Sequence, residues 1–382
     1  MIEPNDARQK NSFINSPRFD ETRVILNPGP EYGDETRMFQ GIPSIERSPN
    51  GRLWAAWYGG GITEDRDNYV MLSTSDDAGE SWSGIKLVVD PDESGPMRAF
   101  DPCLWHDPDG KMWLFWNQML ENKSLIFPEE QERNWFLWAI TTDQSDSESP
   151  SWSEPRQICE AVMLNKPTAL STGEWLLCSS DWRWDWSARV FRSTDHGETW
   201  HHRGRAHVPN KSDRSYDEHM VVERQDGSLW MMVRTKYGIG QSISHDHGRF
   251  WNYVKPTGIN HVCSRFFIRR LRSGNLILVK HGARINQWSV SRCMLSAFLS
   301  DDDGHTWRGG LMLDEREGVS YPDGVEGPDG VLSIAYDHLR GQAKEILMAR
   351  VTERDILEGK LVDTDSKLRL RVNKASGINP RH

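Results

Sequence analysis

Four features of this sequence have side chains that could do chemistry, although they lie far apart along the chain. Residues 64–67 hold three carboxylates that could give or take protons, and Tyr321 is a possible nucleophile if a carboxylate such as Glu218 takes its proton. Arg234 and Arg292 carry guanidinium groups suited to anions. Each also has an ordinary explanation, because acidic loops are commonly solvated turns and buried tyrosines commonly pack with one hydrogen bond. The chemistry therefore depends on a fold that brings these segments together.

An internal repeat predicts that fold. The pattern S-x-D-x-G-x-x-W occurs four times, and a worn copy runs from Thr141 to Trp152. In each copy Ser and Asp can accept backbone N–H bonds across a turn, Gly permits a positive φ, and Trp covers the hairpin. These residues are therefore predicted to be structural. The four complete copies begin at Ser75, Ser193, Ser244 and Ser300.

A second repeat counts the blades independently. Six turn signals, each followed by an apolar strand, lie at residues 49–51, 108–110, 171–173, 225–227, 272–274 and 328–330. Repeated short strands of this kind indicate an all-β, six-bladed β-propeller, with five or seven blades as the alternative. The sixth blade is expected from Val331–Tyr336 and Glu345–Arg350, closed by a strand around residues 22–26. We expect a flexible segment at 1–20, one propeller at 21–355 and a C-terminal extension at 356–382.

Composition excludes several classes of function. The net charge of −10 disfavours nucleic acids and anionic membrane surfaces, and no apolar run is long enough to span a bilayer. The five cysteines are widely spaced, and no His, Asp or Glu grouping has metal-ligand spacing, so neither a metal nor another cofactor is expected. The polar N-terminus predicts a cytoplasmic protein, or a secreted or periplasmic one if a leader has been removed.

The repeats resemble the Asp-boxes of the sialidase (neuraminidase) superfamily from about Phe39 to Arg340. Sialidases begin with an Arg-Ile-Pro motif, whose arginine belongs to a triad that holds the substrate carboxylate. Here that motif reads Gly41-Ile42-Pro43, so the first arginine is missing. The resemblance then implies weak recognition of a sialic acid unless Arg37 or another cation replaces it.

The resemblance also implies roles for the residues named at the outset. Glu218 and Arg234 match the sialidase glutamate and second arginine, Arg292 matches the third, and Tyr321 matches the nucleophile. The proton donor is expected just before the first Asp-box strand, where Glu64, Asp65 and Asp67 compete. Asp101, Lys280 and His281 are further candidates for the lining of the substrate pocket.

These matches predict a retaining, exo-acting glycoside hydrolase that removes a terminal, acidic sugar from an oligosaccharide or glycoconjugate. The 18 tryptophans suit a carbohydrate partner, although most are expected to pack between blades. Two other classes stay open. One is a propeller polysaccharide lyase, in which Tyr321 and His219 or His281 take a proton next to a carboxylate. The other is a non-catalytic carbohydrate-binding propeller.

Overall fold

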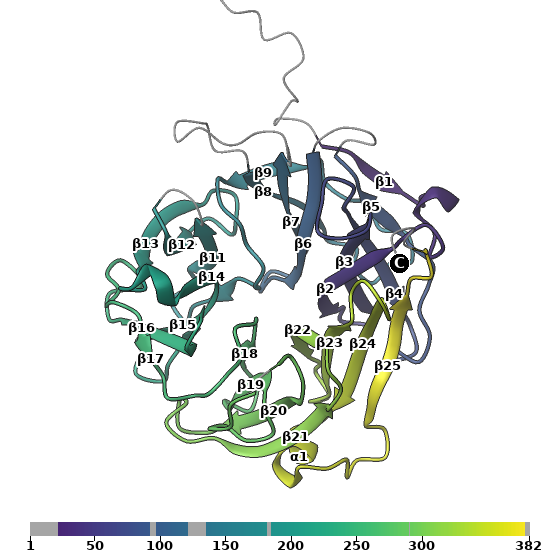
Figure 1. The fold of residues 1–382 in the computed structure, drawn as a ribbon. Helices are drawn as coiled ribbons and strands as arrows, with labels where there is room; N and C mark the ends of the chain where they lie inside the picture. The colour runs from purple at the N-terminus through teal and green to yellow at the C-terminus, as the bar shows by residue number, and fades with distance from the viewer. Residues whose placement is uncertain (1–21, 92–96, 121–134, 182–184, 290, 379–382) are drawn as a thin grey trace, which may run out of the picture.

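The computed structural model describes residues 22–91, 97–120, 135–181, 185–289 and 291–378. Six antiparallel sheets stand around a common axis (Figure 1), which confirms the predicted all-β, six-bladed propeller. The N-terminal segment at 1–20 lies outside the described residues. In five of the sheets four strands follow one another along the chain, and the first sheet has a fifth strand at its outer edge.

The blades are numbered here in chain order. Blade 1 contains β1 (Val24–Leu26), β2 (Phe39–Arg47), β3 (Leu53–Gly60), β4 (Tyr69–Ser75) and β5 (Leu87–Val89). Blade 2 contains β6 (Met97–His106), β7 (Met112–Leu120), β8 (Trp135–Thr142) and β9 (Arg156–Cys159). Blade 3 contains β10 (Thr168–Ala169), β11 (Trp175–Asp181), β12 (Ser187–Ser193) and β13 (His201–Ala206).

The second half of the ring repeats this order. Blade 4 contains β14 (Arg214–Glu223), β15 (Leu229–Thr235), β16 (Gly238–Ser244) and β17 (Lys255–Pro256). Blade 5 contains β18 (Phe267–Arg270), β19 (Leu276–His281), β20 (Leu295–Ser300) and β21 (Arg308–Asp314). Blade 6 contains β22 (Val319–Glu326), β23 (Leu332–His338), β24 (Glu345–Val351) and β25 (Lys367–Lys374), with helix α1 (Glu353–Glu358) before its last strand. Short 3-10 turns lie at Pro30–Tyr32 and Lys211–Asp213.

Each complete Asp-box joins the last two strands of its blade in chain order, and all four have the same hydrogen bonds. In blade 3, Ser193 donates to Asp195 at 2.8 Å and accepts from the Gly197 amide at 2.8 Å, while Asp195 accepts from the Thr199 amide at 3.0 Å. The three other complete copies repeat these bonds within 0.2 Å. The boxes therefore act as turn staples, as the residue types predict.

The closure of the ring differs from the prediction. The N-terminal strand β1 pairs with β5 of blade 1, whereas the outer strand of blade 6 is β25, which lies in the expected C-terminal extension. Among the described residues, no strand is shared between the first and last blades. The ring is closed instead by bonds from β2 to blade 6, such as the Gln40 amide to the Arg340 carbonyl at 3.1 Å. Residues 367–374 alternate between charged and apolar side chains, which is a strand pattern, but they carry neither of the two repeats that locate the blades.

A buried ionic cluster fills the middle of the axis. Lys166 Nζ lies 3.2 Å from both Glu46 Oε2 and Asp323 Oδ2, and Arg265 Nη2 lies 3.3 Å from Asp323 Oδ1. Burial opposes the charge on Lys166, but the carboxylates of Asp323 and Glu46 raise its pKa above the ordinary value. The cluster ties the inner strands of blades 1 and 6 to the segments before β10 and β18. No helix of the described residues is long and apolar enough to cross a membrane.

Candidate active site

The inner strands of four blades are interrupted at the same level around the axis. The register of the inner strand with its neighbour shifts at Gly41–Ser44, Phe100–Cys103, Asp217–Met220 and Ser320–Asp323. At these shifts Ile42, Asp101, Glu218 and Tyr321 have φ values of 56°, 48°, 41° and 54°. Bulges turn side chains out of the pleat, and strained backbone of this kind gathers at functional sites. The local signal is a proline after three of these residues, because proline cannot donate to the ladder.

The bulges bring together the predicted tyrosine, glutamate and arginine. Tyr321 Oη donates to Glu218 Oε1 at 2.7 Å. Arg234 Nη1 contacts the same Glu218 oxygen at 2.7 Å and Tyr321 Oη at 2.9 Å. All three side chains are buried. Tyr321, which is more than 80 positions away from both Glu218 and Arg234 along the chain, therefore forms one hydrogen-bonded triangle with them, with the tyrosine proton already directed at a carboxylate.

The electrostatics of the triangle favour a neutral tyrosine beside an ionised glutamate. Burial alone would raise the pKa of Glu218, but the charge of Arg234 and the hydrogen bonds from Arg234 and Tyr321 lower it below the ordinary value. Burial first, and the Glu218 charge second, raise the pKa of Tyr321. Glu218 can thus accept a proton that Tyr321 does not release by itself.

Two more arginines lie over the Tyr321 ring. Cζ of Arg292, a predicted residue, is 5.3 Å from the ring centroid, and Cζ of Arg340 is 4.2 Å away. Arg340 was not predicted from the sequence, in which Arg37 is the arginine nearest to the missing cation position. A usable signal exists, since Arg340 follows the Tyr336-Asp337 pair by only a few residues.

Arg37 is not the replacement. Its side chain is fully buried and its guanidinium donates to Gln40 at 3.1 Å, to the Tyr32 carbonyl at 2.7 Å and to Asn373 at 2.9 Å. It also pairs with Asp34. These bonds connect the segment before β2 to β25, which is a structural role.

The three acidic candidates of the loop after β3 have separate environments. Glu64 is about half exposed and accepts from Arg340 Nη1 at 2.9 Å. Asp65 is buried and caps the loop, with Oδ1 accepting from the Asp67 amide at 3.1 Å. Asp67 has a 62% exposed side chain and forms an ion pair with Arg66 at 3.5 Å. Asp67 thus has the most exposed carboxylate of the three.

Asp101 lies at the blade 2 bulge with its side chain almost fully buried. Burial first, and the negative charge of Glu64 second, raise its pKa to about 8, with Glu218 adding to the shift. Within the described residues its Oδ1 has no hydrogen-bond partner. The structure thus places Asp101 within electrostatic range of the site as a carboxyl group that is largely neutral at pH 7.

Lys280 and His281, which were predicted to add positive charge to the pocket, are held by contacts within blade 5. Both are fully buried in blade 5. Lys280 Nζ donates to the His281 carbonyl at 2.7 Å, and the His281 ring stacks on His261 at 5.4 Å. Burial lowers the pKa of Lys280 to about 7, so this amine is a poor permanent cation. Both residues pack at the end of β19. The apolar run before them does not show which way their side chains point.

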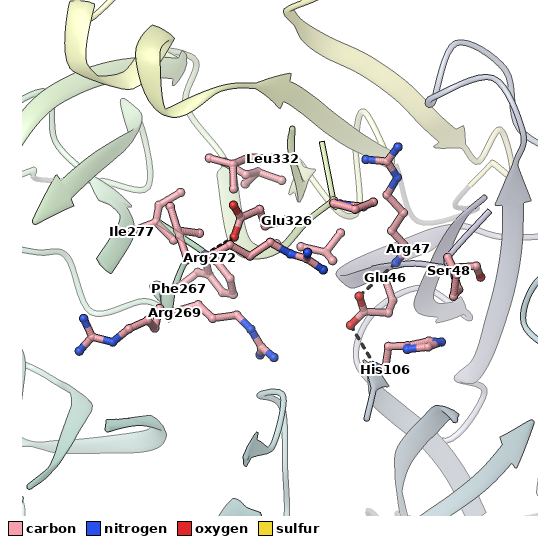
Figure 2. Close-up of a pocket in the computed structure, with 18 of the residues that line it drawn as sticks. Glu46, Arg47, Ser48, His106, Phe267, Arg269, Arg272, Ile277, Glu326 and Leu332 are labelled. Carbon is pink, nitrogen blue, oxygen red and sulfur yellow. Dashed lines mark hydrogen bonds between the residues drawn. The ribbon is translucent and has the colours of Figure 1, made fainter. Parts of the chain in front are cut away.

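A cavity of about 660 Å³ opens at the opposite end of the inner strands (Figure 2). It is lined by the last residues of β2 and β22, whereas Tyr321 is near the start of β22. Figure 2 shows its acidic side chains held by backbone amides: Glu46 by Arg47 and His106, and Glu326 by Arg272. Because the tyrosine–glutamate pair lies at the other end of these strands, we assign the chemistry to the Tyr321 end. No cluster of three metal-ligating side chains occurs among the described residues.

The sequence and the fold are both similar to those of known proteins. The model of the BNR repeat-like domain family matches residues 51–334, which is more than half of the 382-residue chain. No curated protein matches the sequence significantly.

Three solved structures are similar in fold. A Hadza microbial sialidase is 20% identical with a TM-score of 0.63, and the match covers 80% of this chain and 65% of that one, just under two thirds. A leech intramolecular trans-sialidase complexed with 2,7-anhydro-Neu5Ac is 15% identical with a TM-score of 0.64, covering 88% and 71%. A protein of unknown function from Dyadobacter fermentans is 17% identical with a TM-score of 0.60, covering 83% and 93%. The chain therefore belongs to the BNR repeat-like family, as a sialidase-like six-bladed propeller.

Proposed function

We propose that the protein is a retaining, exo-acting glycoside hydrolase that removes a terminal acidic sugar. The observation that carries the proposal is the hydrogen bond from Tyr321 Oη to Glu218 Oε1 at 2.7 Å, with Arg234 on both partners. A tyrosine paired with a base and surrounded by three guanidinium groups is costly to build as mere packing. The similar sialidase structures support a carbohydrate partner.

In the proposed first step Tyr321 Oη attacks the anomeric carbon and its proton passes to Glu218. The glycosidic C–O bond breaks as a proton is given to the leaving oxygen. In the second step water replaces the tyrosine, whose oxygen recovers its proton from Glu218. Two displacements return the original anomeric configuration.

We assign the proton donor to Asp67. Asp65 accepts from the loop backbone and Glu64 pairs with Arg340, whereas Asp67 has the most exposed side chain of the three candidates and pairs with Arg66 at 3.5 Å. Departure of the leaving group would take its proton from Asp67, and the resulting carboxylate would then take a proton from the attacking water.

Arg234 and Arg292 would hold the anionic group of the substrate. Arg234 already donates to Glu218 and Tyr321, and Arg292 lies beside the Tyr321 ring, so both positive charges are close to the reacting atoms. A cationic wall of this kind stabilises a carboxylate by charge-assisted hydrogen bonds and orients the sugar for attack.

A substrate screen with two variants tests this function. Purified protein is assayed on aryl glycosides of neutral sugars, uronic acids and sialic acid, with the first-formed anomer followed by NMR. We expect cleavage of an acidic glycoside with retention, and a loss of about 100-fold or more in kcat for Tyr321→Phe and Glu218→Gln. Inversion, or turnover that both variants leave unchanged, would contradict the proposal.

The lyase alternative has less support. His219 Nε2 contacts the Arg189 carbonyl at 2.7 Å and burial lowers its pKa to about 4. His281 is buried against the Cys293 carbonyl, with its pKa lowered to about 3. Neither histidine is placed as a partner base for Tyr321. An ultraviolet-absorbing unsaturated product in the screen would favour the lyase, and saccharide binding without turnover would favour a binding propeller.

A further inference from the structure

The side chain of Arg340 lies in the space that a side chain at position 41 would occupy. A Cβ atom at position 41 would lie 2.6 Å from Cδ and 2.7 Å from Cγ of Arg340, closer than real Cβ contacts. The Arg340 side chain therefore fills the volume that any side chain at position 41 would need. Because the Arg340 guanidinium also contacts Asp337 and the Tyr321 ring, the glycine and the arginine depend on each other.

Asp337 holds Arg340 at the level of the bulges. Asp337 Oδ2 accepts from the Ile42 amide at 2.8 Å and from Arg340 Nε at 2.8 Å. Its Oδ1 accepts from Ser320 Oγ at 2.6 Å, and that hydroxyl lies 3.2 Å from Arg340 Nη2. One buried carboxylate thus fixes the first blade, the nucleophile strand and the guanidinium in one arrangement. Nε and Nη2 of Arg340 therefore both have hydrogen-bond partners inside the protein.

The outer nitrogen of Arg340 has a replaceable partner. Nη1 contacts Glu64 Oε1 at 2.9 Å, and the Glu64 side chain is 47% exposed, whereas that of Arg340 is 13% exposed. Ion pairs with a solvent-exposed partner contribute little to stability. Glu64 therefore presents to Arg340 the same group, a carboxylate, that an acidic sugar would bring, at a low cost of displacement.

We propose that Arg340 is the third anion-binding arginine of the site, in the space that Gly41 leaves open, and that Glu64 holds its outer nitrogen until a substrate carboxylate replaces it. The inference rests on the proposed function for the presence of an acidic sugar. It assigns specificity to a residue outside the Arg-Ile-Pro position and gives Glu64 a role other than proton donor.

Binding and turnover are measured separately to test Arg340. Free N-acetylneuraminic acid and glucuronic acid are titrated calorimetrically, and the matching aryl glycosides are assayed. Arg340→Gln is expected to weaken binding of the preferred acid about 10- to 100-fold, because a desolvated, charge-assisted contact is lost. Lys344→Gln is the matched control, since it removes one charge close by and, within the described part of the chain, its Nζ donates to the Gln342 carbonyl alone. It should change affinity no more than about twofold.

Two further variants test Glu64 and Gly41. Glu64→Gln is expected to tighten binding of the same acid and to lower KM with kcat retained. Gly41→Arg should lower the melting temperature and the affinity, and the addition of Arg340→Gly should recover both. This exchange keeps the proposal testable if one single variant folds poorly.

The outcomes separate the two proposals. Wild-type protein that binds an acid without cleaving any glycoside refutes the hydrolase function, while Arg340→Gln still decides the anion site. Unchanged affinity in Arg340→Gln, a fall in kcat without tighter binding in Glu64→Gln, or wild type that binds neither acid would each overturn the inference.

Discussion

At the scale of single residues, the site depends on environments that make similar side chains behave differently. Asp65 and Asp67 are two residues apart, yet one caps the loop and the other is exposed. Glu218 is held ionised by Arg234, whereas Asp101 is kept neutral by burial. Such divergence between carboxyl groups is how one site holds both acids and bases near neutral pH.

The role of Asp67 predicts a dependence on the leaving group. Asp67→Asn should lower kcat about 100-fold or more for a natural glycoside, but much less for an activated aryl glycoside that departs without a proton. The comparison uses a set of aryl glycosides of rising phenol pKa. Asp65→Asn is the control one loop position away, and it should lower the melting temperature without this trend. Equal losses across the set for Asp67→Asn would contradict the assignment.

The raised pKa of Asp101 predicts a pH-dependent stability. The folded pKa of about 8 lies above the ordinary aspartate value of 3.8, so the folded state retains a proton that the unfolded state loses. This contribution is complete below the unfolded value and is lost as pH rises through the folded value, at up to about 1.4 kcal/mol per pH unit.

Thermal unfolding of Asp101→Asn against wild type checks that sign. The melting temperature of the variant relative to wild type should increase between about pH 5 and pH 8. A constant difference over this range would show that Asp101 is ionised in the folded protein.

The sequence predicted the residues that follow a repeat and missed those that depend on packing. Glu218, Arg234, Arg292 and Tyr321 stand at fixed places relative to blade strands, so motif order located them. Arg340 could not be predicted from the order of the motifs along the chain, because its place depends on the space above Gly41. Burial of Lys280 and His281 was hidden for the same reason, since strand periodicity does not show which neighbour covers a strand end.

At the scale of elements, the bulged inner strands set the site and the ionic cluster at the axis supports them. Ser44, Ile45 and Arg265 all donate to Asp323, which also pairs with Lys166. The pKa of Asp323 is lowered, because the charges of Lys166 and Arg265 outweigh the effect of burial. The bulges were only partly predictable, since proline marks an interruption without giving its direction.

Removal of Asp323 should therefore be strongly destabilising. Asp323→Ala leaves two buried cations short of a partner, and breaking such a cluster typically costs about 3–5 kcal/mol. Denaturant unfolding should show this loss, whereas Asp329→Ala, which breaks the half-exposed pair with Arg47, should cost at most about 1 kcal/mol. Similar losses for the two variants would mean that the axial cluster has little structural weight.

At the scale of the whole molecule, the ring is closed by the chain ends without an exchanged strand. Asn373 on β25 accepts from Arg37 at 2.9 Å and from Gln40 at 3.0 Å, which links the last strand to the first blade. The six blades were predictable because six turn signals count them, and five Asp-boxes, one of them worn, mark hairpins of the same ring. The outer strand of blade 6 was not, because it carries neither repeat and follows helix α1.

Truncation tests this closure. A chain ending at residue 366 lacks β25 and exposes the edge of β24, so its melting temperature should fall by several degrees or more. An Asn373→Ala variant of the full chain should show a smaller decrease. A truncated chain as stable as the full one would show that residues 367–374 are dispensable.

The most direct test of the whole account is the identity of the nucleophile. Protein inactivated with a fluorinated analogue of the preferred acidic sugar is digested, and the labelled peptide is sequenced by mass spectrometry. We predict one adduct on Tyr321, absent from Tyr321→Phe. An adduct on another residue, or inactivation that proceeds equally in Tyr321→Phe, would contradict the central claim that this propeller works through a tyrosine activated by Glu218.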